Sequence, residues 1–167
     1  MRHHHFGLWA LLAALVSAPA HAQSGGAVAV GRVTVTILKP ITVEAKTEMD
    51  FGSVTPSSSQ SGSVTLDFAD GHRHCSAGMT CLGPHSLADF VIRASNGVVL
   101  VSYHNLQNLT GPGAPMQIEL DTEGGAPATV SITDQQAVVR FGATLTVPQG
   151  QVPGVYSGSF AIEVAYQ

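Results

Sequence analysis

The chain ends with the sequence Gly154-Val155-Tyr156-Ser157-Gly158-Ser159-Phe160-Ala161-Ile162-Glu163-Val164-Ala165-Tyr166-Gln167. Large apolar side chains occupy every second position in its last part, at Phe160, Ile162, Val164 and Tyr166. A period of two is typical of a β-strand with one dry face. Because this strand closes the sequence, we expect one of its edges to be left open. Long apolar edges aggregate unless another strand covers them.

The same period of two recurs along most of the chain. Alternating runs lie at 33–37, 41–45, 64–68, 116–120, 130–132 and 139–147, and continuous apolar runs at 90–92 and 98–103. Clusters of Gly, Pro and polar residues, which favour turns, separate these runs at 56–62, 111–113, 123–125 and 148–154. We therefore predict an all-β protein, an immunoglobulin-like antiparallel β-sandwich that a donated strand would complete if its final edge is open. A closed barrel is the structural alternative.

A second informative stretch lies near the N-terminus. Every second position of it would line one face of a strand, namely Ala27, Ala29, Gly31, Val33, Val35 and Ile37. It is either an ordinary first strand with a frayed start or a strand that leaves its own domain and completes a neighbour's open sheet. Alternation alone does not separate these two interpretations.

The first residues, MRHHHFGLWALLAALVSAPAHAQ, have the pattern of a secretory signal peptide. Arg2 precedes an apolar run from 6 to 16, and Ala20-His21-Ala22 is a small-x-small cleavage site. The run is shorter than the roughly 20 residues that a membrane-spanning helix needs. We predict a signal peptide at 1–22, an N-terminal extension at 23–38 and the sandwich domain at 39–167. The mature chain would then be exported and carry no transmembrane segment.

Length and composition restrict the function classes. A chain of 167 residues suits one domain, and 44% hydrophobic residues suffice for a core. Only 11% of the residues are charged and the formal net charge is −4, which disfavours a nucleic-acid binder. No Gly-x-Ser-x-Gly element or comparable catalytic motif is present. We expect neither enzymatic activity nor a cofactor.

Residues 70–85 combine histidines with both cysteines of the chain. His72, His74, His85, Cys75 and Cys81 are residue types that bind zinc or copper. Two nearby cysteines in an oxidising compartment usually form a disulfide, which we expect between Cys75 and Cys81. The histidines are then solvated loop residues and weak candidates for a metal site. Free thiols are the remaining alternative.

The two ends together resemble a fimbrial (pilus) subunit assembled by the chaperone–usher route. The shared marks are the penultimate Tyr166, Gly154 at the fourteenth position from the end, and the apolar row Phe160, Ile162 and Val164 between them. The resemblance implies that a periplasmic chaperone pairs with this final strand. The N-terminal extension of a like subunit then replaces the chaperone at an outer-membrane usher.

A second resemblance covers most of the mature chain. The segments 49–54 (MDFGSV), 142–147 (GATLTV) and 153–160 (PGVYSGSF) are similar to a family of exported bacterial proteins of uncharacterised function that are regarded as pilin-like. The resemblance implies a structural role.

These observations favour a structural subunit of a surface pilus that polymerises by strand donation, located first in the periplasm and then at the cell surface. The alternative from a different class is a freestanding periplasmic binding module, for a glycan or for a metal at His72, His74 and His85. Both interpretations remain open on sequence alone.

Overall fold

The computed structural model describes residues 32–123 and 125–167, of which Thr36–Gln167 form one compact unit. Eleven strands lie in this unit: β1 (Thr42–Thr47), β2 (Ser53–Thr55), β3 (Gly62–Leu66), β4 (Arg73–Cys75), β5 (Thr80–Leu82), β6 (Ala88–Arg93), β7 (Gly97–His104), β8 (Ile118–Thr122), β9 (Ala128–Ile132), β10 (Gln136–Val147) and β11 (Ala161–Tyr166). The described residues contain no helix, and hence none long and apolar enough to cross a membrane.

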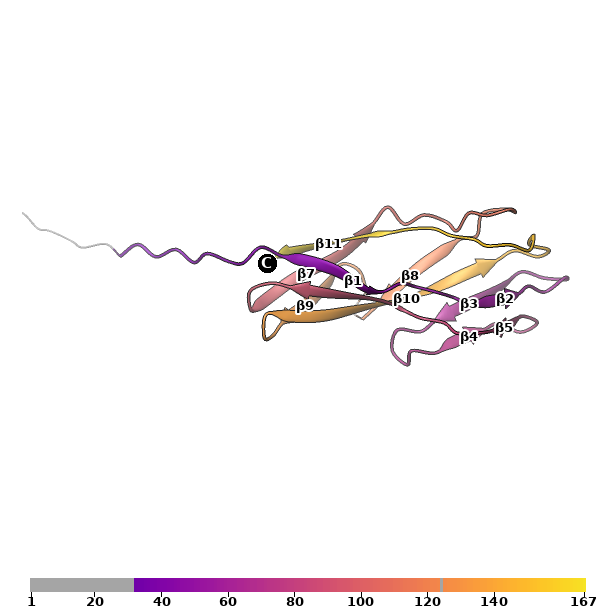
Figure 1. Ribbon diagram of the computed structural model, residues 1–167, viewed down its shortest axis with the longest axis horizontal. Helices are drawn as coiled ribbons and strands as arrows, with labels where there is room; N and C mark the ends of the chain where they lie inside the picture. The colour runs from indigo at the N-terminus through magenta and orange to yellow at the C-terminus, as the bar shows by residue number, and fades with distance from the viewer. Residues whose placement is uncertain (1–31, 124) are drawn as a thin grey trace, which may run out of the picture. The chain divides into compact units, whose positions relative to one another are not determined.

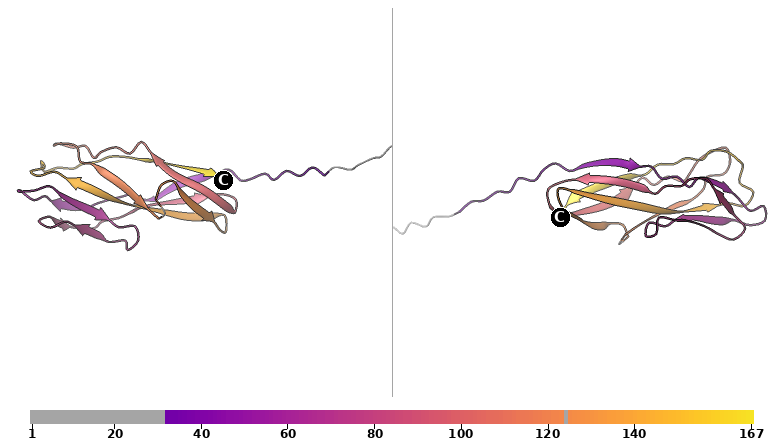
Figure 2. Two further views of the ribbon diagram at one scale, coloured as in Figure 1. Left: turned by 180° about the vertical axis from the view of Figure 1, so that it is seen from behind. Right: turned by 60° about the horizontal axis from the view of Figure 1, so that its bottom comes forward.

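The strands form antiparallel sheets that stack as a sandwich (Figures 1 and 2). The larger sheet has the order β1-β6-β10-β3-β4, with β8 also paired to β10. The sheet opposite has the order β11-β7-β9, and β2 and β5 form a small sheet of their own. The predicted all-β antiparallel sandwich is therefore confirmed, and the barrel alternative is wrong because both larger sheets end in open edges.

The long strand β10 joins two halves of the larger sheet. Its residues 136–141 pair with β6, and its residues 143–147 pair with β3. On its other edge, residues 141–145 pair with β8. The partners are far apart in the sequence: Thr65 Oγ1 and Thr144 Oγ1 lie 3.0 Å apart across a separation of 79 residues.

Each half of β10 lies in its own apolar core. The first core fills the space between the two stacked sheets and includes Ile92, Val99, Val101 and Phe141. Phe90, Tyr103 and Phe160 contact Phe141 edge to face, an arrangement that aromatic rings favour. The second core lies around the other half of β10 and is built from residues such as Val64, Leu66, Leu145 and Val147. The second core packs against loop segments and the small β2–β5 sheet, whereas the first core packs against the three-stranded sheet β11-β7-β9.

The structure corrects the sequence prediction at several places. Residues 33–37 are predicted as a strand but pair with no other strand, because no described segment offers them backbone partners. The short strands β2, β4 and β5 are missed because each has only three residues and no alternating pattern. The predicted signal peptide at 1–22 and the first part of the extension, through residue 31, lie outside the described residues.

Candidate functional site

The C-terminal strand β11 has one free edge. It pairs only with β7 among the described strands, in a regular antiparallel register from Ala161↔His104 to Tyr166↔Val99. The N–H of Gln167 continues this ladder by donating to Val98 O at 3.3 Å. Because backbone groups alternate between the two edges of a strand, the odd-numbered residues face β7 and the even-numbered ones face away from it. The free edge therefore exposes the backbone of Ile162, Val164 and Tyr166.

The segment before β11 continues this free edge without regular strand geometry. Ser159 O accepts from the N–H of Gln107 at 3.0 Å, and Ser157 exchanges two hydrogen bonds with Thr110 at 2.8 and 2.9 Å. Odd-numbered residues again face the partner segment. One edge of the whole stretch 156–166 is thus unpaired in the described chain.

Strand β1 is the matching edge of the opposite sheet. It pairs only with β6 among the described strands, and five of its six residues are exposed. The sequence predicts an apolar row along this strand, yet Val43 keeps 40% of its surface exposed and Ala45 is also exposed. No described segment covers this row, although the apolar pattern is typical of a strand face that is buried.

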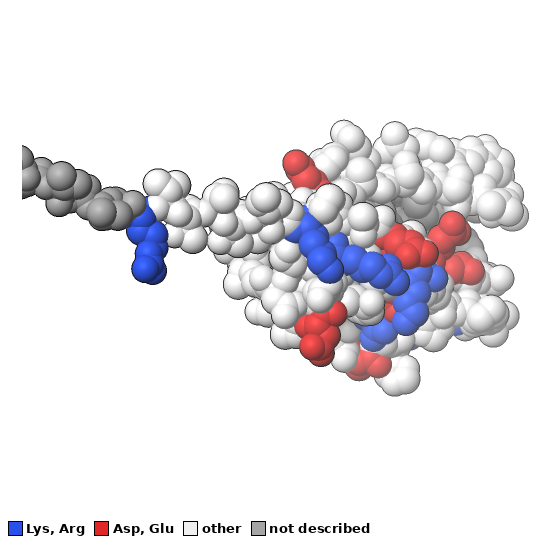
Figure 3. Space-filling model, turned by 60° about the vertical axis from the view of Figure 1, so that its left-hand side comes forward, with Lys and Arg blue, Asp and Glu red and all other residues white. Residues whose placement is uncertain are grey.

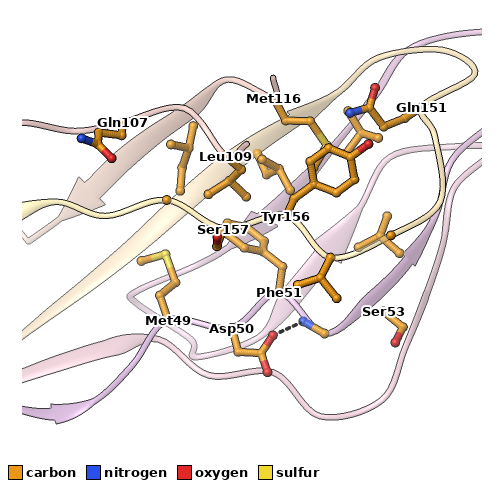
Figure 4. Close-up of a pocket in the computed structure, with 18 of the residues that line it drawn as sticks. Met49, Asp50, Phe51, Ser53, Gln107, Leu109, Met116, Gln151, Tyr156 and Ser157 are labelled. Carbon is orange, nitrogen blue, oxygen red and sulfur yellow. Dashed lines mark hydrogen bonds between the residues drawn. The ribbon is translucent and has the colours of Figure 1, made fainter. Parts of the chain in front are cut away.

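A groove of about 720 Å³, lined by both apolar and polar residues, extends from the gap between these two edges. It is lined by the residues that follow β1, at 48–56, and by those that precede β11, at 151–160. Met116, Ile118, Leu145 and Val147 also line it, and these four belong to the second core. Figure 4 shows Leu109, Met116 and the ring of Tyr156 gathered in this groove.

The wall formed by residues 50–55 is fixed by polar contacts. Gly52 has a positive φ of 69°, its N–H donates to Asp50 Oδ1 at 2.8 Å, and a Cβ there would lie 2.4 Å from Pro84 O (Figure 4). The guanidinium of Arg73 donates to Phe51 O at 2.6 Å and to the backbone of the 82–83 turn. Arg73 is a positioning residue that sequence reasoning misses, since a single arginine gives no signal of the carbonyls that it bridges.

The opposite wall depends on Gly154. Its φ is +154°, and a Cβ at this position would lie 2.4 Å from Cγ of Pro112. Glycine therefore allows the 151–160 segment to pass close to the loop at 111–113. Two residues further on, the hydroxyl of Tyr156 donates to Val152 O at 2.8 Å and fixes the ring in the groove.

The predicted final-strand residues do not all occupy the same place. Gly154 and Phe160 line the groove, whereas Ile162 and Val164 are half-buried in the first core. Tyr166 reaches across to the opposite sheet, where its hydroxyl donates to Lys39 O at 2.7 Å and accepts from the N–H of Ser95 at 2.8 Å. The gap between β1 and β11 is thus bridged at the Tyr166 end and widens into the groove at the other.

The candidate donor residues that the structure describes are strongly exposed. Val33, Val35 and Ile37 keep 96%, 80% and 89% of their surface accessible. Ala27, Ala29 and Gly31 lie outside the described residues. An exposed row of three large apolar side chains is costly in water, and its spacing fits one face of a strand.

The predicted disulfide between Cys75 and Cys81 is present, and no described cysteine is free. Cys75 pairs with Val64 in the larger sheet, while Cys81 pairs with Val54 on β2. The bridge therefore ties a wall of the groove to the larger sheet.

The histidines of this loop do not converge on one point. His74 lies 3.0 Å from Asp70 and groups with Asp70 and Asp67, whereas His72 and His85 are not part of that group. The N–H of His72, and more weakly the side chain of His74, hold the pKa of Asp70 below its ordinary value. Asp70 Oδ1 accepts from the N–H of His72 at 2.7 Å and Asp67 Oδ1 from that of Ala69, also at 2.7 Å, so these carboxylates already stabilise the turn.

Several charged side chains lie on neighbouring strands of the larger sheet. Figure 3 shows basic side chains flanked by acidic ones on one face. Arg140 forms a bidentate ion pair with Asp89, at 2.8 and 3.2 Å, and Arg93 lies 3.2 Å from Glu44. The hydrogen bonds from Arg140 hold the pKa of Asp89 below its ordinary value. In contrast, among the described residues the groove is lined by only two charged ones, Glu48 and Asp50.

Comparisons with known proteins give one match. A family model described as a domain of unknown function, DUF4402, matches residues 41–166. No curated protein and no solved structure matches the chain.

Proposed function

Because the chain belongs to the DUF4402 family, a domain of unknown function, we propose its role from the groove and the free edges. The chain is a structural subunit of a pilus-like surface fibre. Residues 27–37 of one copy enter the gap between β1 and β11 of the next copy and complete its sandwich. The free edge of β11, next to a groove that residues of the second core line, is the observation that carries this proposal.

The shape of the gap supports an extended peptide as its occupant. Strand addition needs a row of unpaired backbone groups and pockets for alternate side chains. The edge of 156–166 supplies the first, and the groove supplies the second. A compact ligand would use the groove but leave the rest of this edge uncovered.

Two features of the extension support its role as the donor strand. Its alternating stretch 27–37 equals the free edge 156–166 in length. Its charge is also suitable, because Arg32 is the single charged residue between 23 and 38 and its position is out of phase with Val33 and Val35. The apolar row would face the core while Arg32 faces solvent.

The energy available from such burial is large for a domain of this size. Three side chains such as Val33, Val35 and Ile37 contribute roughly 1.5–3 kcal/mol each when fully buried. Burial thus supplies on the order of 5–10 kcal/mol before the ordering of the strand is subtracted. Because a whole domain is stable by only about 5–15 kcal/mol, the occupied groove would dominate the stability of the subunit.

The proposal includes the route of assembly that the sequence resemblance implies. A signal peptide at 1–22 directs export, a periplasmic chaperone covers the free edge of β11, and an outer-membrane usher joins like subunits at the cell surface. No catalytic step is required. The low charge also suits a subunit that is covered by its neighbours.

The deciding experiment uses the domain without its extension. The protein is produced from Lys39 onward, and its thermal unfolding and size are measured with and without a peptide of residues 23–38. The mature chain is measured alongside, and the same peptide with Val35→Asp is the matched control. We expect the peptide to raise the melting temperature by tens of degrees and the control to do almost nothing. A truncated domain that is already stable and ignores the peptide rejects the proposal.

The alternative of a metal-binding module has one supporting observation, the group formed by Asp67, Asp70 and His74. We prefer the structural role, because Asp67 and Asp70 already accept hydrogen bonds from the turn and His72 and His85 lie outside the group. Titration with zinc, copper and calcium tests this alternative. A melting temperature that rises with metal and loses that response in His74→Ala would favour the binding module.

A further inference from the structure

Lys39, which lies just before β1, is held by three separate parts of the fold. Its N–H donates to Ser95 Oγ at 2.8 Å, and its C=O accepts from the hydroxyl of Tyr166 at 2.7 Å. Its ammonium group donates to Gln135 Oε1 in the turn before β10. The hydroxyl of Tyr166 is itself fixed by the N–H of Ser95. These four residues, Lys39, Ser95, Gln135 and Tyr166, are here called the Lys39 clasp.

We infer that the Lys39 clasp prevents the chain from inserting residues 27–37 into its own groove, so that the occupant is the extension of a second copy. This inference rests on the proposed function. The gap between β1 and β11 accepts a strand from either source. The clasp favours the second copy because it holds the backbone of Lys39, which joins the extension to the sandwich of the same chain.

Self-insertion requires the chain to reverse direction between Ile37 and Thr42. The hydrogen bonds to Ser95 and Tyr166 occupy both backbone groups of Lys39, which lies in the middle of that reversal. Pro40 has no N–H to close a turn, and it disfavours helical backbone angles at the residue before it. A reversal at this point therefore breaks the clasp.

The surroundings of Lys39 agree with this constraint. Thr36, Ile37 and Leu38 belong to the same compact unit as the sandwich, and all three are exposed. They do not occupy the groove of their own domain. A second copy has no such tether, so its extension enters the groove while both clasps stay intact.

The test uses the full mature chain with Tyr166→Phe, which removes the hydroxyl and keeps the ring. Tyr103→Phe is the matched control, because Tyr103 is half-buried in the same core and its hydroxyl has no hydrogen bond among the described residues. Each protein is made with and without Val35→Asp, which blocks insertion from either source. The measurements are the polymer fraction that survives mild detergent and the melting temperature of the isolated monomer.

We expect Tyr166→Phe to shift the population from polymer to monomer by about tenfold, the effect of losing one or two hydrogen bonds. Its monomer should melt well above its Val35→Asp counterpart, because it contains its own inserted strand. In the wild type and in Tyr103→Phe, Val35→Asp should remove the polymer without changing the melting temperature of the monomer.

Two other outcomes overturn the inference and differ from each other. In the first, Val35→Asp removes the polymer in every background, but the Tyr166→Phe monomer melts no higher than its Val35→Asp counterpart. This result supports strand donation and contradicts the role of the clasp. If Val35→Asp changes neither measurement in any background, the proposed function falls and the inference falls with it. Should Tyr166→Phe fail to fold, Ser95→Ala replaces it, since it removes only the acceptor for the N–H of Lys39.

Discussion

The two ends of β10 lie in cores that are closed to different extents. At residues 136–141, β10 pairs with β6 and its apolar side chains are covered by the sheet β11-β7-β9. At residues 143–147 it pairs with β3, and the layer opposite consists of loop segments and the small β2–β5 sheet around an open groove. Phe141 and Leu145 are both buried, at 1% and 3% exposure. Burial of single residues therefore does not distinguish a finished half from an unfinished one.

The difference lies in what covers each half. A sheet satisfies its backbone through a ladder of hydrogen bonds, whereas loop segments satisfy theirs one contact at a time. The walls of the groove accordingly depend on individual devices, namely Arg73, the Cys75–Cys81 bridge and Gly154. The open half is thus fixed in position before any strand occupies it.

The largest expected effect comes from the closed half. Phe141→Ala should cost about 3–5 kcal/mol of unfolding free energy, because it removes the ring that three other aromatic side chains contact. Leu145→Ala, on the same strand but beside the groove, should cost only about 2 kcal/mol, since its surroundings are already open on one side. Chemical denaturation of the 39–167 domain, saturated with the 23–38 peptide, measures both. Equal costs would contradict the distinction between the two halves.

A smaller effect is expected when the disulfide is removed. The Cys75–Cys81 bridge closes a loop with a sequence separation of 6, for which chain entropy gives about 2 kcal/mol. Replacing both cysteines with Ala should lower the unfolding free energy by that amount and weaken capture of the 23–38 peptide as well, because β2 and β5 lose their tie to β4. Calorimetric titration with the peptide checks the second effect. Unchanged peptide affinity would show that the wall is held by Arg73 without the bridge.

Gly154→Ala should lower the free energy of unfolding by about 1–3 kcal/mol. The new Cβ would lie 2.4 Å from Cγ of Pro112, and the backbone has a conformation that only glycine adopts easily. Gly150→Ala is a useful control, since its φ is also positive, at 65°, and nothing lies near the position of its Cβ. The two variants should therefore differ in peptide binding more than in stability. Similar peptide affinities in both would mean that the 151–160 wall tolerates displacement.

The smallest effect concerns acid stability in the closed half. Because Arg140 lowers the pKa of Asp89 in the folded protein, the pair stabilises the fold above the ordinary Asp pKa of about 3.9. That contribution disappears as the pH falls through the lowered pKa. Arg140 is half exposed, so we expect only about 1 kcal/mol. Asp89→Asn should flatten the loss of stability as the pH falls below about 5, as measured by urea unfolding. If stability falls with pH as steeply in Asp89→Asn as in the wild type, the acid sensitivity comes from other carboxylates.

Sequence reasoning located the fold and part of the site for identifiable reasons. Alternation at β11 and β10 reflects burial of one face, which any sandwich requires, so the strand prediction held there. The same alternation at 33–37 gave a strand that the single chain does not form, because pairing depends on a partner that periodicity does not encode. The carbonyls bridged by Arg73 and the clasp at Lys39 depend on contacts between distant segments, and these leave no local pattern.

The pairing of β3 with β10 also sets the order in which this fold can form. Thr65 and Thr144 meet across 79 residues, so β3 has no partner in the larger sheet except β4 until nearly the whole chain is available. Folding that waits for such distant contacts is slow, on the scale of milliseconds to seconds for comparable β-proteins. Unpaired edges are exposed throughout that interval and are prone to aggregation. A chain with this topology gains from being escorted while it folds, whatever its final assembly.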